Sequence, residues 1–365
     1  MTRFLATLCA CLLLSFAARA ADTIKLGIGY PMSGEVASLG ADVRAGFDLA
    51  LEDINAKGGP AGRKIEAQFE DDVCDPKTGV IVAGRFIAAK KDAVIHICST
   101  VCMAAGPLYA EENIPFFNMC NADGITAQGF GNVARAWMSN MRVGGALAAL
   151  AAKHLPKKKL AVLYAADAYS RNLGEDMIAV LDKEYGVKPD FTLRLAGQEQ
   201  DFSSIITQLK DGGIETVYLG FWPKGIGMFL RQADAAGYRP QFLSNDVANG
   251  DEIIKIGGAG SDGLIFTMPP DPKDFPEAAD VMKALAAKGF AGRPYAVYSY
   301  MIAQIYAQAV EKAGSAAPDA VMKAVKGNAF DTVAGKVSFT PNGDMTGLEM
   351  QYFQWRGGKY APWKP

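Results

Sequence analysis

Histidine is scarce in this sequence, and the common signatures of catalysis are missing from it. The chain of 365 residues holds only two histidines, His96 and His154. His96 lies within an apolar run that is typical of a buried strand, and neither a G-x-S-x-G turn nor a phosphate-binding loop occurs. We therefore expect a protein that is not an enzyme and that uses no cofactor and no metal.

The sequence also lacks an excess of charge of one sign, and it lacks long apolar runs after its first twenty residues. Lys and Arg total 37 against 39 Asp and Glu, which leaves a formal net charge of -2. Nucleic-acid binders usually carry a basic excess, so we expect no nucleic-acid partner. Beyond residue 21 no apolar run approaches the length that a membrane-spanning helix needs.

The first twenty residues have the pattern of a secretory signal peptide. Arg3 precedes the apolar run Phe4–Ala17, and Ala18-Arg19-Ala20 ends it with small residues at the cleavage positions. A buried helix is the alternative interpretation. We expect residues 1–20 to be removed after Ala20 and the remaining chain to be exported to the periplasm.

The cysteines agree with export. Outside the signal peptide there are four, all within one stretch of the chain: Cys74, Cys98, Cys102 and Cys120. An even number of cysteines in an exported chain predicts disulfides, with three possible pairings. A zinc site is the alternative, which the lack of a C-x-x-C spacing disfavours.

Short apolar runs alternate with amphipathic stretches along the chain. Runs such as 23–30, 93–97, 160–164 and 216–219 are typical of buried strands, and helical spacing separates them. This alternation predicts an α/β fold of doubly wound, mostly parallel sheets covered by helices on both faces. The length favours two such sheets. Binding sites in these folds lie beyond the carboxyl ends of the strands.

Polar and aromatic residues gather in the loops that follow the predicted strands. They include Ser33, Ser99, Thr100, Asn121, Asp123, Tyr169, Phe221, Trp222, Asn245 and Asp246. Ser and Thr at such positions most often cap helices, but the same geometry presents hydroxyls and backbone N–H groups to a carboxylate. The acidic residues Glu70, Asp71, Asp72 and Asp75 fit a solvated turn better than a calcium loop, because they lack the EF-hand spacing.

Several segments, in this order and spacing, resemble the periplasmic substrate-binding proteins of ABC importers. The resemblance is to the leucine/isoleucine/valine-binding branch with the type I fold, and it covers the chain after the signal peptide. The segments that carry it are Ile24–Gly27, Met32–Gly34, Asp53–Gly59, Asp71–Pro76, Leu230–Ala233 and Ala235–Gly237.

The resemblance implies two lobes joined by three crossovers, with the ligand between them. Lobe 1 would comprise residues 22–141 and 268–340, and lobe 2 residues 142–267 and 341–365. The ligand-binding positions that it implies are Leu39, Ser99, Cys120, Asn121, Ala122, Tyr169, Trp222, Asp246 and Tyr295. Asp246 would pair with an α-ammonium group, although Asn245 could occupy that place instead. The family's disulfide corresponds to Cys74–Cys98, and Cys102–Cys120 would be an additional bridge.

The function that follows is that of a monomeric solute-binding component of an ABC importer, which delivers its ligand to permease subunits in the inner membrane. The expected ligand is a small carboxylate-bearing solute, such as a branched-chain or related amino acid. Leu39 and the segment Met119–Asp123 depart from the family pattern, and an aromatic carboxylate such as a benzoate or phenylpropanoid acid is the alternative. A periplasmic sensor that feeds a receptor is the second alternative.

Overall fold

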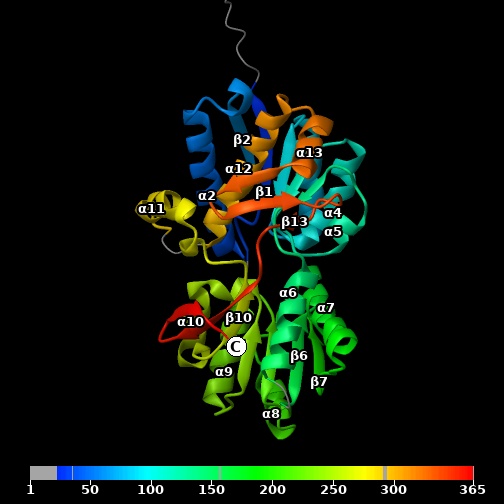
Figure 1. Cartoon of the computed structure of the whole chain (residues 1–365). Helices are drawn as coiled ribbons and strands as arrows, with labels where there is room; N and C mark the ends of the chain where they lie inside the picture. Colours follow the sequence, from blue (N-terminus) through cyan, green and yellow to red (C-terminus); the bar gives the residue numbers. More distant parts are fainter. Residues whose placement is uncertain (1–22, 35, 156–157, 291–293, 365) are drawn as a thin grey trace, which may run out of the picture.

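The computed structural model describes residues 23–34, 36–155, 158–290 and 294–364. The predicted signal peptide and its cleavage site, with Cys9 and Cys11, lie outside these residues. Figure 1 shows two lobes, one above the other, and the chain passes between them more than once. None of the helices within the described ranges is long and apolar enough to span a bilayer.

The first lobe is built on a five-stranded parallel sheet. Its strands follow the order β2 (Ile65–Asp71), β1 (Ile24–Tyr30), β3 (Ala93–His96), β4 (Phe116–Asn118) and β5 (Val133–Arg135). Every residue of β3, β4 and β5 is buried, as expected for parallel strands covered on both faces. The helices of this lobe are α2 (Ala37–Ala56), α3 (Pro76–Ala88), α4 (Ser99–Glu111), α5 (Gly124–Ala127), α11 (Ala279–Ala287), α12 (Pro294–Ala313) and α13 (Pro318–Gly327).

The second lobe is built on a seven-stranded sheet. Its strands follow the order β15 (Lys359–Pro362), β14 (Gln351–Arg356), β10 (Ile265–Met268), β9 (Gln241–Ser244), β8 (Thr216–Gly220), β6 (Leu160–Ala165) and β7 (Phe191–Leu195). All pairings are parallel except those that β14 makes with β10 and β15. The helices are α6 (Asn140–Ala149), α7 (Ala168–Tyr185), α8 (Ser203–Asp211), α9 (Pro223–Ala235) and α10 (Asp251–Gly257). The predicted α/β fold with doubly wound parallel sheets is therefore confirmed.

Shorter elements complete the chain. A π-helical turn, η2 (Leu150–His154), extends α6, and 3₁₀ turns form η1 (Pro60–Gly62), η3 (Asp246–Asn249), η4 (Gly258–Ser261), η5 (Pro272–Asp274) and η6 (Pro276–Ala278). A three-stranded antiparallel sheet of β11 (Ala329–Thr332), β12 (Gly335–Phe339) and β13 (Met345–Thr346) lies beside α12 and α13.

The division of the chain into lobes by residue number remains our proposal, and the strand pairing bears on its last boundary. Because β13 pairs with β12, residues up to Thr346 accompany the first lobe, rather than only those up to residue 340. The three connections between the lobes then run through residues 136–139, 269–271 and 347–350.

Side chains at the helix ends fix loops in both lobes, at the ends where the lobes face each other. The Asp75 side chain accepts the Thr78 N–H at the start of α3, and the Asp167 carboxylate accepts the N–H groups of Tyr169 and Ser170 at the start of α7. Helices α2 and α12 pack closely at Gly46, where a Cβ atom would lie 2.0 Å from the Ala296 carbonyl oxygen.

Candidate ligand-binding cleft

A small inner cavity lies where the carboxyl ends of the two sheets face each other. Both lobes line it: the first through α2, α12 and the loops after β3, β4 and β5, the second through α7, η3 and the loop after β8. Its lining residues are Leu39, Ile97, Ser99, Met119, Asn121, Trp137, Tyr169, Trp222, Asp246, Val247 and Tyr295. All but two of the ligand-binding positions predicted from the sequence meet here.

The two exceptions are Cys120 and Ala122. Both are fully buried in a separate apolar cluster inside the first lobe, and the structure places neither at the cavity wall. The segment after β4 sends alternate side chains in opposite directions, so that Met119 and Asn121 line the cavity while Cys120 and Ala122 pack inward. Met119 was not among the predicted positions, and the residues Met119–Ala122 do not themselves show which side of the segment faces the core.

The cavity has one wall made of hydrogen-bond donors. Ser99 is the first residue of α4, whose thirteen residues direct the positive end of the helix dipole toward it. The Ser99 Oγ accepts the N–H groups of Asn121 at 3.1 Å and of Ala122 at 3.3 Å. Its own proton is therefore available to donate. The Nδ2 of Asn121, a residue only 5% exposed, has no hydrogen-bond partner among the described residues. These donors suit a carboxylate.

Two disulfides hold this wall in place. Cys98 is the N-cap residue of α4, and its bond to Cys74 fixes the start of the helix beside Ser99. The bond between Cys102 and Cys120 ties α4 to the segment that carries Met119 and Asn121. The pairing Cys74–Cys98 that the family resemblance implied, and the additional bridge, are both present in the structure.

Another part of the cavity lining is centred on Asp246, which belongs to the second lobe. Its Oδ1 accepts the Tyr169 hydroxyl at 2.6 Å, and its Oδ2 accepts the Trp137 Nε1–H at 3.2 Å and the Tyr295 hydroxyl at 3.3 Å. Burial raises the pKa of Asp246, while these three hydrogen bonds oppose the rise. Asn245 points elsewhere, because its side chain contacts Val247 N and Tyr218 Oη. Asp246 is therefore the residue that faces the cavity.

Aromatic rings form the remaining walls. Tyr169 and Trp222 lie with their ring centroids 5.0 Å apart and their planes 32° apart, and Trp137 and Tyr295 lie 5.3 Å and 31° apart. Trp137 follows the carboxyl end of β5, a strand of three residues that was not among the strands predicted from the sequence, so Trp137 was not predicted either. The rings offer flat apolar surfaces to a ligand.

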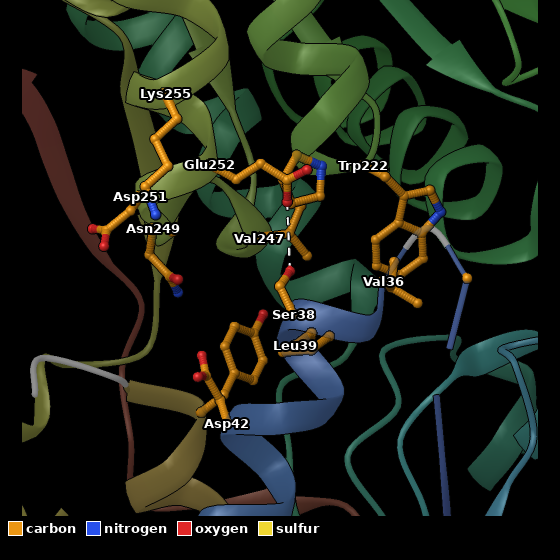
Figure 2. A pocket seen from close by; sticks show the side chains of 14 residues that line it. Val36, Ser38, Leu39, Asp42, Trp222, Val247, Asn249, Asp251, Glu252 and Lys255 are labelled. Atoms are coloured by element: carbon orange, nitrogen blue, oxygen red, sulfur yellow. Dashed lines mark hydrogen bonds between the residues drawn. The ribbon is translucent and has the colours of Figure 1, made fainter. Parts of the chain in front are cut away.

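The cleft continues outward into a larger cavity of about 400 Å³, shown in Figure 2. The two cavities share Leu39, Trp222, Val247 and Tyr295. Figure 2 shows Ser38 on the helix below and Glu252 on the helix above, joined by a hydrogen bond of 3.5 Å across the cleft. This contact connects α2 of the first lobe with α10 of the second.

The acidic residues of the predicted solvated turn have their own local partners. Asp72 contacts His96 Nδ1 at 3.0 Å, and His96 Nε2 lies 2.8 Å from the Tyr109 hydroxyl, all within the buried interior of the first lobe. Asp75 caps α3, and Glu70 pairs with Arg85 at 2.7 Å. Among the described residues no group of three or more acidic, His or Cys side chains is placed to hold a metal ion.

Comparison with known proteins places this architecture in a family. A family model described as periplasmic binding protein matches residues 23–359. The chain belongs to the periplasmic binding proteins. A "Leu/Ile/Val-binding protein homolog 1" from Brucella abortus is 33% identical over 348 residues, which are 94% of each chain. A "leucine-, isoleucine-, valine-, threonine-, and alanine-binding protein" from Pseudomonas aeruginosa is 30% identical, over 92% of this chain and 91% of that one.

Solved structures of periplasmic binding proteins share the fold. The leucine-binding protein LivK from Thermotoga maritima superposes with a TM-score of 0.87 at 24% identity, over 94% of this chain and 98% of that one. A solute-binding protein of an ABC transporter from R. palustris, solved in complex with benzoate, gives a TM-score of 0.82 at 22% identity, over 93% and 95%. This periplasmic binding protein therefore has the type I fold of the leucine/isoleucine/valine-binding branch, as its sequence predicted.

Proposed function

We propose that this protein is the periplasmic solute-binding component of an ABC importer and that it binds a small carboxylate-bearing solute between its lobes. The observation that carries the proposal is the donor wall, where the Ser99 hydroxyl and the unpartnered Asn121 amide meet the N-terminus of α4. Charge-assisted hydrogen bonds to a carboxylate gain strength in such a buried site.

The proposed ligand class is a branched-chain or related amino acid. Asp246 of the second lobe lines the same cavity as the donors of the first lobe, so an α-ammonium group would meet its carboxylate while the ligand's carboxylate meets Ser99. Leu39, Ile97 and Val247 offer apolar contact to a side chain. The curated relatives that are named for leucine, isoleucine and valine support this assignment.

An aromatic carboxylate is the second candidate, and one observation favours it. The Asp246 carboxylate already accepts three hydrogen bonds from neutral donors, so it needs no ammonium group to be stabilised. The rings of Trp137, Tyr169, Trp222 and Tyr295 would then contact the ligand's ring. Both candidates share the donor wall and differ only in what faces Asp246.

The lobes would close around the ligand because only the closed arrangement makes both sets of contacts. The ligand shifts the population toward closure by the difference between its affinities for the two states. The closed protein, a monomer in the periplasm after cleavage at Ala20, would then be recognised by the permease subunits in the inner membrane. It binds and releases its solute without chemical change, as a transport component rather than an enzyme.

A thermal-shift panel on residues 21–365 tests this proposal. The protein is first unfolded and refolded to remove any co-purified ligand, then mixed with amino acids, benzoate-type acids and phenylpropanoid acids. A bound ligand raises the melting temperature by mass action. Stabilisation by leucine-like amino acids that is lost in Asp246→Ala supports the first candidate. Stabilisation by aromatic acids alone supports the second, and no stabilisation by any carboxylate contradicts the proposal.

A further inference from the structure

Arg135 is a buried cation that lies behind the donor wall and outside the cavity. It is the last residue of β5 and is only 2% exposed. Every N–H donor of its guanidinium has an acceptor. Nη1 donates to the carbonyl oxygens of Asn121 at 2.9 Å and Ala122 at 3.0 Å, Nη2 to Thr126 Oγ1 and Asp344, and Nε to Asp344 at 2.8 Å.

One peptide group connects Arg135 directly with Ser99. The carbonyl oxygen of the Asn121–Ala122 peptide accepts from Arg135, and the N–H of that same peptide donates to Ser99 Oγ at 3.3 Å. The cation orients the peptide plane and polarises it, and polarised hydrogen bonds in a chain strengthen one another. Because the Ser99 oxygen already accepts two N–H groups, its own proton is left free to donate to a group in the cavity that Ser99 lines.

Arg135 also connects this peptide with the segments that join the lobes. Asp344 lies in the turn between β12 and β13, shortly before the crossover at 347–350. In the same turn, the Gly343 carbonyl accepts the backbone N–H of Arg135 at 2.7 Å. The Asn121 carbonyl additionally accepts the Asn140 N–H at 2.7 Å, at the end of the crossover 136–139. The guanidinium thus lies between two of the three connections and the donor wall.

We infer that Arg135 is a positioning residue for carboxylate recognition, which it supports by holding the Asn121–Ala122 peptide against Ser99 while it is anchored by Asp344. It touches no ligand. The inference rests on the proposed function, since it concerns the group that binds the ligand's carboxylate. According to this inference, Arg135 contributes to the preference for a carboxylate over an uncharged amide, and not only to stability, although it does not line the cavity.

Matched pairs of acid and primary amide separate this role from a purely structural one. We would measure dissociation constants for L-leucine with L-leucinamide, and for benzoate with benzamide, by calorimetry on wild type, Arg135→Lys and Asp344→Asn. Lysine keeps the positive charge but lacks the planar guanidinium, which donates to the carbonyl oxygens of both Asn121 and Ala122. Asp344→Asn is the milder change, because that carboxylate is partly exposed and its oxygen acceptor is retained. Asp331→Asn is the control, an exposed carboxylate of the same small sheet that pairs with Lys336.

We expect Arg135→Lys to weaken binding of the acid about 3- to 10-fold, at most the effect of losing one hydrogen bond to a charged group, because Arg135 acts on the donors and not on the ligand, and to change binding of the amide much less. Asp344→Asn should act in the same direction and more weakly, and the control should behave like wild type. Folded variants that keep the wild-type ratio of acid to amide affinity, or that lose both affinities equally, would overturn the inference. If the proposed function itself is wrong, wild type will bind neither L-leucine nor benzoate. This outcome can be told apart from the others, and it overturns the inference as well.

Discussion

The side-chain amide of Asn121 is buried at the cavity wall, yet its Nδ2 lacks a hydrogen-bond partner among the described residues. An unsatisfied buried donor costs about 1–3 kcal/mol, and proteins rarely retain one without a reason. Under the proposed function, the position of Asn121 beside Ser99 would supply the reason, because a bound carboxylate would accept from both side chains. The cost is then borne by the ligand-free protein and recovered on binding.

Replacing Asn121 with alanine should therefore separate stability from function. In the ligand-free protein we expect the melting temperature of Asn121→Ala to stay the same or rise, because an unpartnered polar group is removed. Affinity for the carboxylate ligand should fall about 10-fold. Asn132→Ala is the matched control: that amide is buried away from the cavity and donates to the Ile114 carbonyl, so its loss should lower stability and leave affinity unchanged. An Asn121→Ala variant that loses stability but keeps its affinity for the carboxylate would contradict the assignment of Asn121 to the ligand.

At the level of single residues the sequence predicted most of the cavity. Ser99, Asn121 and Asp246 follow strands, and the family resemblance assigned them to the ligand. Trp137 could not be recognised as a partner of Asp246, because the two are separated by 109 positions and meet only when the lobes meet. Cys120 and Ala122 were misplaced because a loop's two faces cannot be told apart without knowing which one faces the core.

At the scale of elements, α7 meets the loop before α5 through two carboxyl groups. Asp176 of α7 is half-buried and hydrogen-bonded to Asp123, and burial together with this neighbouring charge raises the pKa of Asp176 to about 6. The unfolded chain would release the same proton near the ordinary value of 3.8. Folding therefore takes up a proton between these pH values, and the contribution of Asp176 to stability falls as the pH rises from about 4 to about 6.

The variant Asp176→Asn should be more stable than wild type at neutral pH, because an amide carries no charge to repel Asp123. We expect a gain of about 1 kcal/mol at pH 7.5, discounted for the solvent exposure of the site, or about 2 °C in melting temperature. At pH 4.5 the gain should fall to about a third, because Asp176 is still protonated there in the folded protein while the unfolded chain has already released most of that proton. Melting curves at the two pH values, with the exposed Asp182→Asn on the same helix as control, measure the difference. An equal gain in melting temperature at both pH values would contradict the expected link between stability and the protonation of Asp176.

Elements with continuous buried runs were predicted to within a few residues. The expected strands at 93–97, 160–164 and 216–219 correspond to β3, β6 and β8. The small sheet of β11 to β13 was missed. Its strands are short, and β11 alternates exposed and buried residues without a long apolar run, so its pairing depends on packing beside α12 and α13 rather than on local pattern.

At the scale of the whole molecule, residues of both lobes line one cavity. Tyr295 of α12 reaches Asp246 of the second lobe, and Ser38 of α2 reaches Glu252 of α10. These contacts join residues that belong to different lobes, and opening of the cleft would break them. The family resemblance predicted the two-lobed arrangement, but the set of residues that meet across the cleft depends on how closely the lobes approach, which no local pattern encodes.

The proposed function requires that a carboxylate binds between the lobes at Ser99. Calorimetric titration of refolded wild type and Ser99→Ala with L-leucine and with benzoate tests it most directly. We predict that wild type binds at least one of the two acids and that Ser99→Ala binds the same acid about 10-fold more weakly or worse, because a donor to the charged group is lost. A folded Ser99→Ala variant that binds the acid as tightly as wild type would show that Ser99 does not bind the carboxylate.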